Sequence, residues 1–201
     1  MYTLNKESWN TRTMVKVSVL GVIGFILMLF DFPLWFAPPF LKFDISDLPS
    51  LIGAFSLGPM AGVLVQLLKN ILNVVIEGST TMIVGEFSNF VVGSIFAYIA
   101  GYIYYKDKNF KNALIGLIVG TFAMTALISV INYFFMIPFY AKLFGMSIEK
   151  IVDMGNAVNK RVVDFKSLII YAIVPFNLLK GLVVSLVTIL IYKKISPILH
   201  R

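Results

Sequence analysis

Long uninterrupted runs of apolar residues constrain this chain more than any other feature. Each run approaches or exceeds the length of about 20 residues that a helix needs to cross a hydrocarbon core roughly 30 Å thick. Hydrophobic residues make up 59% of the chain and charged residues only 13%, a balance that a soluble domain of 201 residues could not bury. We therefore expect an all-α membrane protein surrounded by the lipid bilayer. The clearest runs cover residues 17–30, 91–105, 113–139 and 168–192.

The residue types that are missing exclude several classes of function. The sequence has no cysteine, and its one histidine, His200, is next to last. Disulfides, thiolate metal sites and cysteine nucleophiles are therefore excluded, and no histidine is placed for a catalytic dyad or an intramembrane zinc site. We expect a binding protein rather than an enzyme, with no metal and no cofactor.

The net charge of +7 comes from separate basic clusters rather than from one continuous basic face. Clusters of this kind are typical of the cytoplasmic edges of membrane spans, so they do not indicate nucleic-acid binding. The three clusters are Lys6, Arg12 and Lys16; Lys106, Lys108 and Lys111; and Lys193, Lys194 and Arg201.

The same clusters predict how often the chain crosses the membrane. If the N-terminus and the loop at 106–111 are both cytoplasmic, an even number of crossings separates them, yet only three long apolar segments are evident there. The fourth candidate is Leu48–Leu57, with Asp47 as a plausible N-cap and Gly58 at its end. At about 15 Å of helical rise it is a half-helix, too short to cross alone.

We therefore expect one integral membrane domain over residues 1–201, with six transmembrane helices and both termini cytoplasmic. A second external segment, 145–166, carries a short amphipathic stretch at 148–154. The expected helices are 15–30, Leu48–Leu57, 60–76, 86–105, 112–141 and 167–192.

The connection between the first two helices, residues 31–47, has an unusual composition. It contains three prolines, which restrict the backbone, and five aromatic residues. We expect an ordered external cap loop rather than a flexible linker, although an aromatic belt at the membrane interface would have a similar composition. The aromatic residues are Phe32, Trp35, Phe36, Phe40 and Phe43.

Polar side chains interrupt the later helices at helical spacing. Inserting a charged side chain at the bilayer centre costs about 2.5–3.5 kcal/mol of free energy. Polar groups in membrane helices therefore usually face a cavity or a partner. They predict a polar interior, although Asn, Ser and Thr can also serve only as hydrogen-bond links between helices. Lys69 and Glu86 could form a buried ion pair or lie near the interfaces. The polar stripes are Gln66, Asn70, Asn73 and Glu77; Glu86 and Asn89; Thr125, Ser129 and Asn132; and Asn177 and Lys180.

Asn177 and Lys180 are the strongest candidates for ligand binding. Lys180 precedes the basic tail by about thirteen residues, or roughly 20 Å of helix, which is too far for its ammonium to reach the interface easily. An amide offers a donor and an acceptor, and an ammonium offers donors only. Together they suit a planar heterocycle that alternates carbonyl groups with an N–H, but they do not single out one ligand.

Helix 15–30 lacks polar residues of this kind and carries small residues on one face instead. Ser18, Gly21 and Gly24 repeat at intervals of three residues. Small residues allow another helix to approach closely, so this face is expected to dock a partner.

Five segments carry a further signal through their order and spacing, although each is weak alone. They are LKFDISDLPSLIGAFSLGPMAG (41–62), LLKNIL (67–72), GEFSNF (85–90), the helix around Asn132, and PFNLLKG (175–181). With the six-helix plan, they resemble the RibU-type riboflavin-binding S component of energy-coupling factor (ECF) vitamin transporters over nearly the whole chain.

The resemblance implies a multi-pass protein of a prokaryotic cell membrane that binds riboflavin for uptake, with FMN as a second candidate ligand. It also implies two kinds of partner, a membrane T component and two ATPase subunits. This chain has no G-x-x-x-x-G-K-[ST] run, so ATP would be hydrolysed elsewhere.

The resemblance also implies roles for individual residues. Asn132, Asn177 and Lys180 match positions that hydrogen-bond the flavin ring. Ser18, Gly21 and Gly24 replace the Ala-x-x-x-Ala pattern with which S components usually dock the T component. The other expected ligand contacts are Glu86, Asn89, Leu41, Phe43 and Asp44.

Two alternatives stay open from the sequence. S components for thiamin, biotin or folate share the same plan, although the Asn-x-x-Lys of the last helix favours riboflavin. A stand-alone secondary transporter would normally show repeated halves and a coupling-ion site, and no internal repeat is evident.

Overall fold

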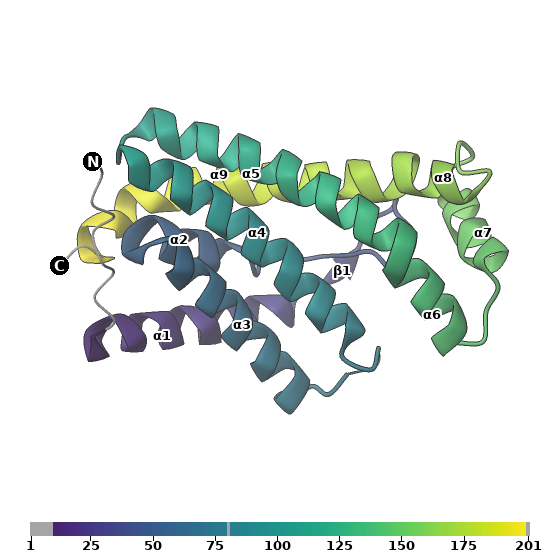
Figure 1. Cartoon of the computed structure of the whole chain (residues 1–201), viewed down its shortest axis with the longest axis horizontal. Coiled ribbons are helices and arrows are strands. Elements are labelled where there is room, and N and C mark those ends of the chain that lie inside the picture. Colours follow the sequence, from purple (N-terminus) through teal and green to yellow (C-terminus); the bar gives the residue numbers. More distant parts are fainter. Residues whose placement is uncertain (1–9, 80, 200–201) are drawn as a thin grey trace.

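The computed structural model describes residues 10–79 and 81–199, with side chains up to Ile191. Long helices run along one another, and a short pair of strands lies among them (Figure 1). Lys6, His200 and Arg201 of the sequence analysis lie outside the described residues. Only the backbone is described at Lys193 and Lys194.

Five helices of the described chain are long and apolar enough to cross a membrane, which confirms an all-α membrane protein. The last two are composite, because each passes through a π-helical segment. The five are α1 (Thr11–Met28); α3 (Pro59–Ile76); α4 (Val84–Lys106); α5 (Phe110–Ile131) with η1 (Asn132–Met136) and α6 (Ile137–Leu143); and α8 (Phe165–Leu168) with η2 (Ile169–Ile173) and α9 (Val174–Leu199).

The short helix α2 (Leu48–Leu57) has the bounds that the sequence predicted. Pro49 lies in its first turn, and Gly58, with a φ of 120°, ends it in a conformation that favours glycine. Asp47 occupies the predicted N-cap position, but its side chain makes no capping hydrogen bond to the helix. Nearly all of α2 is buried among α1, α3, α4 and α9, as expected for a helix that is apolar all round.

The helices meet at two opposite ends of the bundle. The start of α1, the end of α9, the α2–α3 turn and the α4–α5 turn lie at one end, on the left in Figure 1. Arg12 and Lys16 in the first turns of α1 therefore lie at the same end as Lys106 and Lys111 of the α4–α5 turn. The helix α7 (Ile148–Val158) lies at the other end.

Glycines allow close contact between neighbouring helices, above all between α4 and α5. A Cβ atom placed on Gly116 of α5 would lie 2.6 Å from the carbonyl oxygen of Ala100 of α4. Phe55, Phe96 and Leu117 fill the core around these contacts and are at most 1% exposed. The helix backbones thus touch where side chains are absent, and aromatic rings fill the remaining space.

The cap between α1 and α2 is a small hairpin. Strand β1 (Phe32–Pro33) pairs antiparallel with β2 (Lys42–Phe43), and the rings of Phe32 and Phe43 lie 5.5 Å apart. Lys42 forms an exposed ion pair with Asp31 at 3.0 Å. Phe43 is buried whereas Trp35 is 88% exposed, so the aromatic residues of the cap divide between the interior and the surface.

The amphipathic stretch predicted at 148–154 belongs to the longer helix α7, which begins at the N-cap Ser147. Its apolar face, with Ile151 and Val152, joins Val162 and Leu168 in a second buried cluster. That cluster covers the ends of α6 and α8, so α7 closes the bundle at the end opposite the basic clusters.

Candidate functional site

A lysine of α9 meets two aspartates next to α2. The Nζ atom of Lys180 lies 3.0 Å from Oδ2 of Asp44 and 3.4 Å from Oδ2 of Asp47. All three residues are at most 9% exposed. Buried charges are stable only when they are paired and hydrogen-bonded, so these contacts fix the end of the cap against α9.

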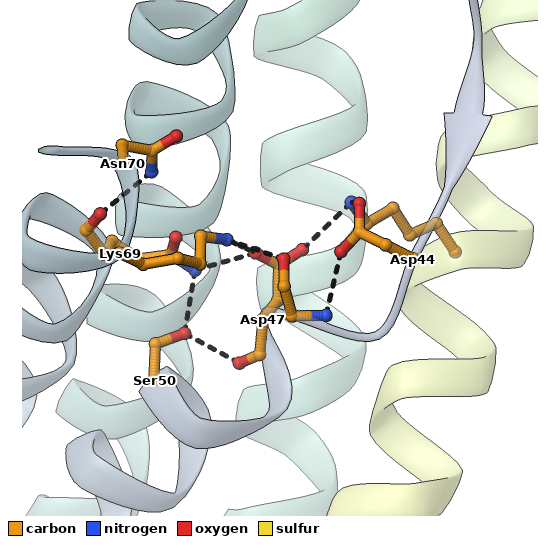
Figure 2. A network of polar contacts seen from close by, with 8 residues as sticks. Asp44, Asp47, Ser50, Lys69 and Asn70 are labelled. Carbon is orange, nitrogen blue, oxygen red and sulfur yellow. Dashed lines mark hydrogen bonds and ion pairs between the residues drawn. The ribbon is translucent and has the colours of Figure 1, made fainter. Parts of the chain in front are cut away.

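A second lysine completes the network from α3 (Figure 2). Lys69 is fully buried and donates to Oδ1 of Asp47 at 2.9 Å and to the hydroxyl of Ser46 at 2.8 Å. The alternative of an ion pair between Lys69 and Glu86 is therefore wrong. Asp47, which belongs to the connection before α2, takes the place that the sequence analysis gave to Glu86.

Uncharged groups hold the carboxylates in place. Gln66 donates to Oδ1 of Asp47 at 2.7 Å and to the hydroxyl of Ser50 at 2.8 Å. Ser50 donates in turn to the backbone carbonyl of Asp47 at 2.6 Å, and the backbone N–H of Ser46 donates to Asp44 at 2.8 Å. The first turn of α2 is thus bound to α3 through one continuous set of hydrogen bonds.

Asp47, Ser46 and Ser50 were missed as site residues by the sequence analysis. A signal for the aspartate was present, because Asp44 and Asp47 stand at i,i+3 just before a fully apolar helix. If this apolar helix is buried in the bundle, the two carboxylates next to it are buried too, and each needs a buried cation as its partner. Among the long apolar helices, Lys69 and Lys180 are the deep lysines.

Asn177 and Asn132 both lie beside π-helical segments. Asn177 is buried and donates to the carbonyl of Ile173, the last residue of η2, at 2.8 Å. Asn132 opens η1 and donates to the carbonyl of Ile128 at 2.9 Å. Short π-helical segments inside helices frequently occur at functional sites.

Apolar cap residues extend the site next to these polar groups. Phe43 and Phe176 belong to one buried cluster, and Leu41 packs against it. Phe176 is the neighbour of Asn177 in sequence, and Asp44 follows Phe43. The structure therefore brings four predicted ligand contacts together, and Asn177 lies three residues before Lys180 on α9: the four are Leu41, Phe43, Asp44 and Lys180.

The hydrogen bonds of Glu86 lie in the loop between α3 and α4, not among the cap residues. Its Oε2 atom accepts from Ser79 at 2.9 Å and from Thr81 at 3.0 Å, so it organises the loop between α3 and α4. Ile83 in this loop has a φ of 70°, an unusual conformation for a β-branched residue.

Removing the Glu86 carboxylate should loosen that loop. We expect Glu86→Ala to increase the rate of chymotrypsin cleavage near Met82, which is 70% exposed, because two hydroxyls lose their acceptor. Limited proteolysis followed by mass spectrometry measures this rate. Glu77→Ala is the matched control, since Glu77 is an exposed carboxylate at the end of α3. Equal cleavage of both variants would contradict the role of Glu86.

Several buried oxygen atoms line α3, α4 and α5 without a hydrogen-bond partner in the described chain. Each of them can accept a hydrogen bond from a group outside this set of residues. These atoms include Oε1 of Gln66, Oδ1 of Asn70, Oδ1 of Asn89 and Oγ1 of Thr125. Asn73 and Glu77 of the predicted stripe are less buried, since Asn73 is intermediate and Glu77 is exposed.

The small residues of α1 divide between two surroundings. Gly21 and Gly24 are buried, and a Cβ atom on Gly21 would lie 2.6 Å from the side chain of Leu68 in α3. A Cβ atom on Gly24 would lie 3.3 Å from the side chain of Lys69 and 3.3 Å from the backbone oxygen of Ser46. Ser18 is exposed, so of the three predicted docking residues it alone lies on the surface.

Comparison with known proteins gives the family. The family model described as the substrate-specific component of ECF transporters matches residues 12–192. The chain belongs to this family. As an S component it is a membrane-embedded substrate-binding subunit of a transporter rather than an enzyme, as the sequence predicted.

Curated relatives and a solved structure agree with this membership. The S component is 37% identical to the riboflavin transporter RibU of Staphylococcus aureus (strain TCH60), over 94% of this chain and 93% of that protein. It is 34% identical to the riboflavin transporter FmnP of Bacillus subtilis (strain 168), over 92% and 93%. A solved S component of a bacterial ECF transporter has 36% identity and a TM-score of 0.72, covering 94% of this chain and 98% of that one.

Proposed function

We propose that this S component binds riboflavin and presents it for uptake by an ECF transporter. The observation that carries the proposal is the convergence of cap and helix residues inside the bundle. Asp44 of the cap pairs with Lys180 of α9, and Phe43 packs in one cluster with Phe176, so a flat ring here would meet apolar walls and a few oriented polar groups. Relatives named as riboflavin transporters support this choice of ligand.

The proposed contacts divide by chemistry. Asn132, Asn177 and Lys180 hydrogen-bond the flavin ring, because amides and an ammonium match its alternating carbonyl groups and N–H. Leu41 and Phe43 form the apolar wall.

The ribityl chain has its own partners in this proposal. The Oδ1 atom of Asn89 and the similar oxygen atoms of α3 and α5 accept hydrogen bonds from its hydroxyl groups. Glu86, three residues before Asn89 on α4, is also a proposed ligand contact.

The same proposal includes the topology and the partners. Six crossings, with α2 as a half-helix and both termini cytoplasmic, agree with the basic residues at one end of the bundle. Residues 31–47 then form the external cap of a single domain, 1–201. A T component and two ATPase subunits supply the energy, and Ser18 with the α1 surface is the proposed contact with the T component.

Titration with riboflavin tests the ligand directly. We expect purified wild-type protein to quench riboflavin fluorescence in a saturable manner at submicromolar concentrations, because the ring becomes buried against protein groups. Thiamin and biotin, titrated in competition, are the controls for the other S-component substrates. Tight binding of either, without quenching of riboflavin, would reject riboflavin as the substrate.

Uptake separates an S component that depends on partners from a stand-alone transporter. Cells that express this chain without the ATPase subunits should accumulate no labelled riboflavin above background. Accumulation against a gradient in such cells would contradict the proposed dependence on partners.

A further inference from the structure

The charges buried beside the cap sum to zero. Lys69 and Lys180 face Asp44 and Asp47 at N···O distances of 2.9, 3.0 and 3.4 Å. Lys69 is fully buried, and even Lys180 is only 9% exposed. Charges in such surroundings are screened little by water or salt, so an imbalance among them would be felt by a ligand bound nearby.

Asp47 is the residue that joins the two lysines. Its Oδ1 atom accepts from Lys69 and Gln66, and its Oδ2 atom lies next to Lys180. If its charge were removed, Lys69 would keep the hydroxyl of Ser46 and Lys180 would keep Asp44. One positive charge would then stay uncompensated inside the bundle.

We propose that Asp47 is a positioning residue that holds Lys180 and balances the buried charge, so that the site selects an uncharged flavin over an anionic one. The inference rests on the proposed function for the identity of the ligand. A phosphate monoester carries about −1.5 to −2 charges at neutral pH. With the ammonium groups of Lys69 and Lys180 already paired, such a group would lose its hydration without gaining a free cation beside the cap.

Three variants test this balance, with the ratio of the Kd for FMN to the Kd for riboflavin as the readout. Asp47→Asn leaves a net charge of +1 and should lower the ratio. Lys69→Met leaves −1 and should raise it. For a phosphate monoester within roughly 10 Å at an effective dielectric of about 20, each change is about a hundredfold. The double variant Asp47→Asn/Lys69→Met is neutral again, and its ratio should return close to the wild-type value.

The opposite signs separate charge balance from structural damage. A damaged fold would weaken both ligands together in each single variant and leave the ratio unchanged. Asp31→Asn is the matched control, because it removes one acid of the same cap from an exposed pair with Lys42. Its ratio should equal that of the wild type. If Asp47→Asn does not fold, Lys69→Met and the double variant still have to give a raised and a restored ratio.

Two results overturn the proposal in different ways. A wild-type protein that binds no riboflavin would refute the proposed function itself. Intact riboflavin binding with an unchanged ratio in Lys69→Met and Asp47→Asn, or a wild-type protein that binds both flavins equally, would refute the role of Asp47 while leaving riboflavin as the ligand.

Discussion

Replacing Lys180 by alanine should weaken riboflavin binding by at least tenfold, or about 1.4 kcal/mol. The variant loses an ammonium that is proposed to donate to the flavin ring, and it leaves the carboxylate of Asp44 buried without its nearest cation. Breaking one side of a buried pair typically costs about 3–5 kcal/mol, so the thermal stability should fall as well. Fluorescence quenching measures the affinity, and unfolding followed in detergent measures the stability.

A double variant separates these two effects. Lys180→Met/Asp44→Asn removes both charges of one pair and keeps side chains of similar size. Its stability should recover toward that of the wild type, while its affinity for riboflavin stays low. Lys142→Ala is the control for an exposed lysine at the end of α6 and should change neither quantity. Unchanged affinity in Lys180→Ala would show that Lys180 serves only to hold the cap.

Replacing Gly116 by leucine should lower the stability more than other apolar substitutions in α5. The added Cβ would lie 2.6 Å from the backbone oxygen of Ala100, and backbone cannot move aside as a side chain can. Overpacking costs about 1–3 kcal/mol and more when helices must separate. For a chain of this length that corresponds to a drop in Tm of roughly 5–10 °C.

Val119→Leu is the matched control for this substitution. Val119 lies three residues further along α5 and is 43% exposed, so a larger side chain there meets lipid or detergent. Its Tm should stay within about 1 °C of the wild type, since exposed changes of this kind usually cost less than about 0.5 kcal/mol. A Gly116→Leu protein as stable as this control would contradict the close approach of α4 and α5.

The sequence predicted the helices well because their signals are local. Apolar runs located the long helices to within a few residues, except that α9 continues to Leu199 rather than ending at 192. Charge parity revealed α2, whose ends are marked by Pro49 and Gly58. The π-helical segments were not predicted. Asn132–Met136 and Ile169–Ile173 have ordinary apolar sequences, so only packing between helices distinguishes them from α-helix.

The residues of the site were predicted less completely than the helices. The reason is that its ion pairs join residues far apart in the sequence. Asn177 and Lys180 were found from their depth in one helix. Their partners come from the connection before α2, and Lys180 and Asp44 are 136 positions apart in the chain. Hydrophobic periodicity does not report which acid will face which base across such a distance. The sequence therefore offered Glu86 as one candidate partner of Lys69 and did not reveal Asp47.

The distance between Asp44 and Lys180 along the chain also has a consequence for biosynthesis. A ribosome synthesises the helices in order, so the acids before α2 are made long before α9. Lys69, which follows 22 residues after Asp47, can neutralise that carboxylate early. The partner of Asp44 in the described ion pairs is Lys180, which is made only with α9. The ion pair that holds the cap against α9 can therefore form only after the last helix has been made, and a nascent chain stalled before α9 lacks this part of the site.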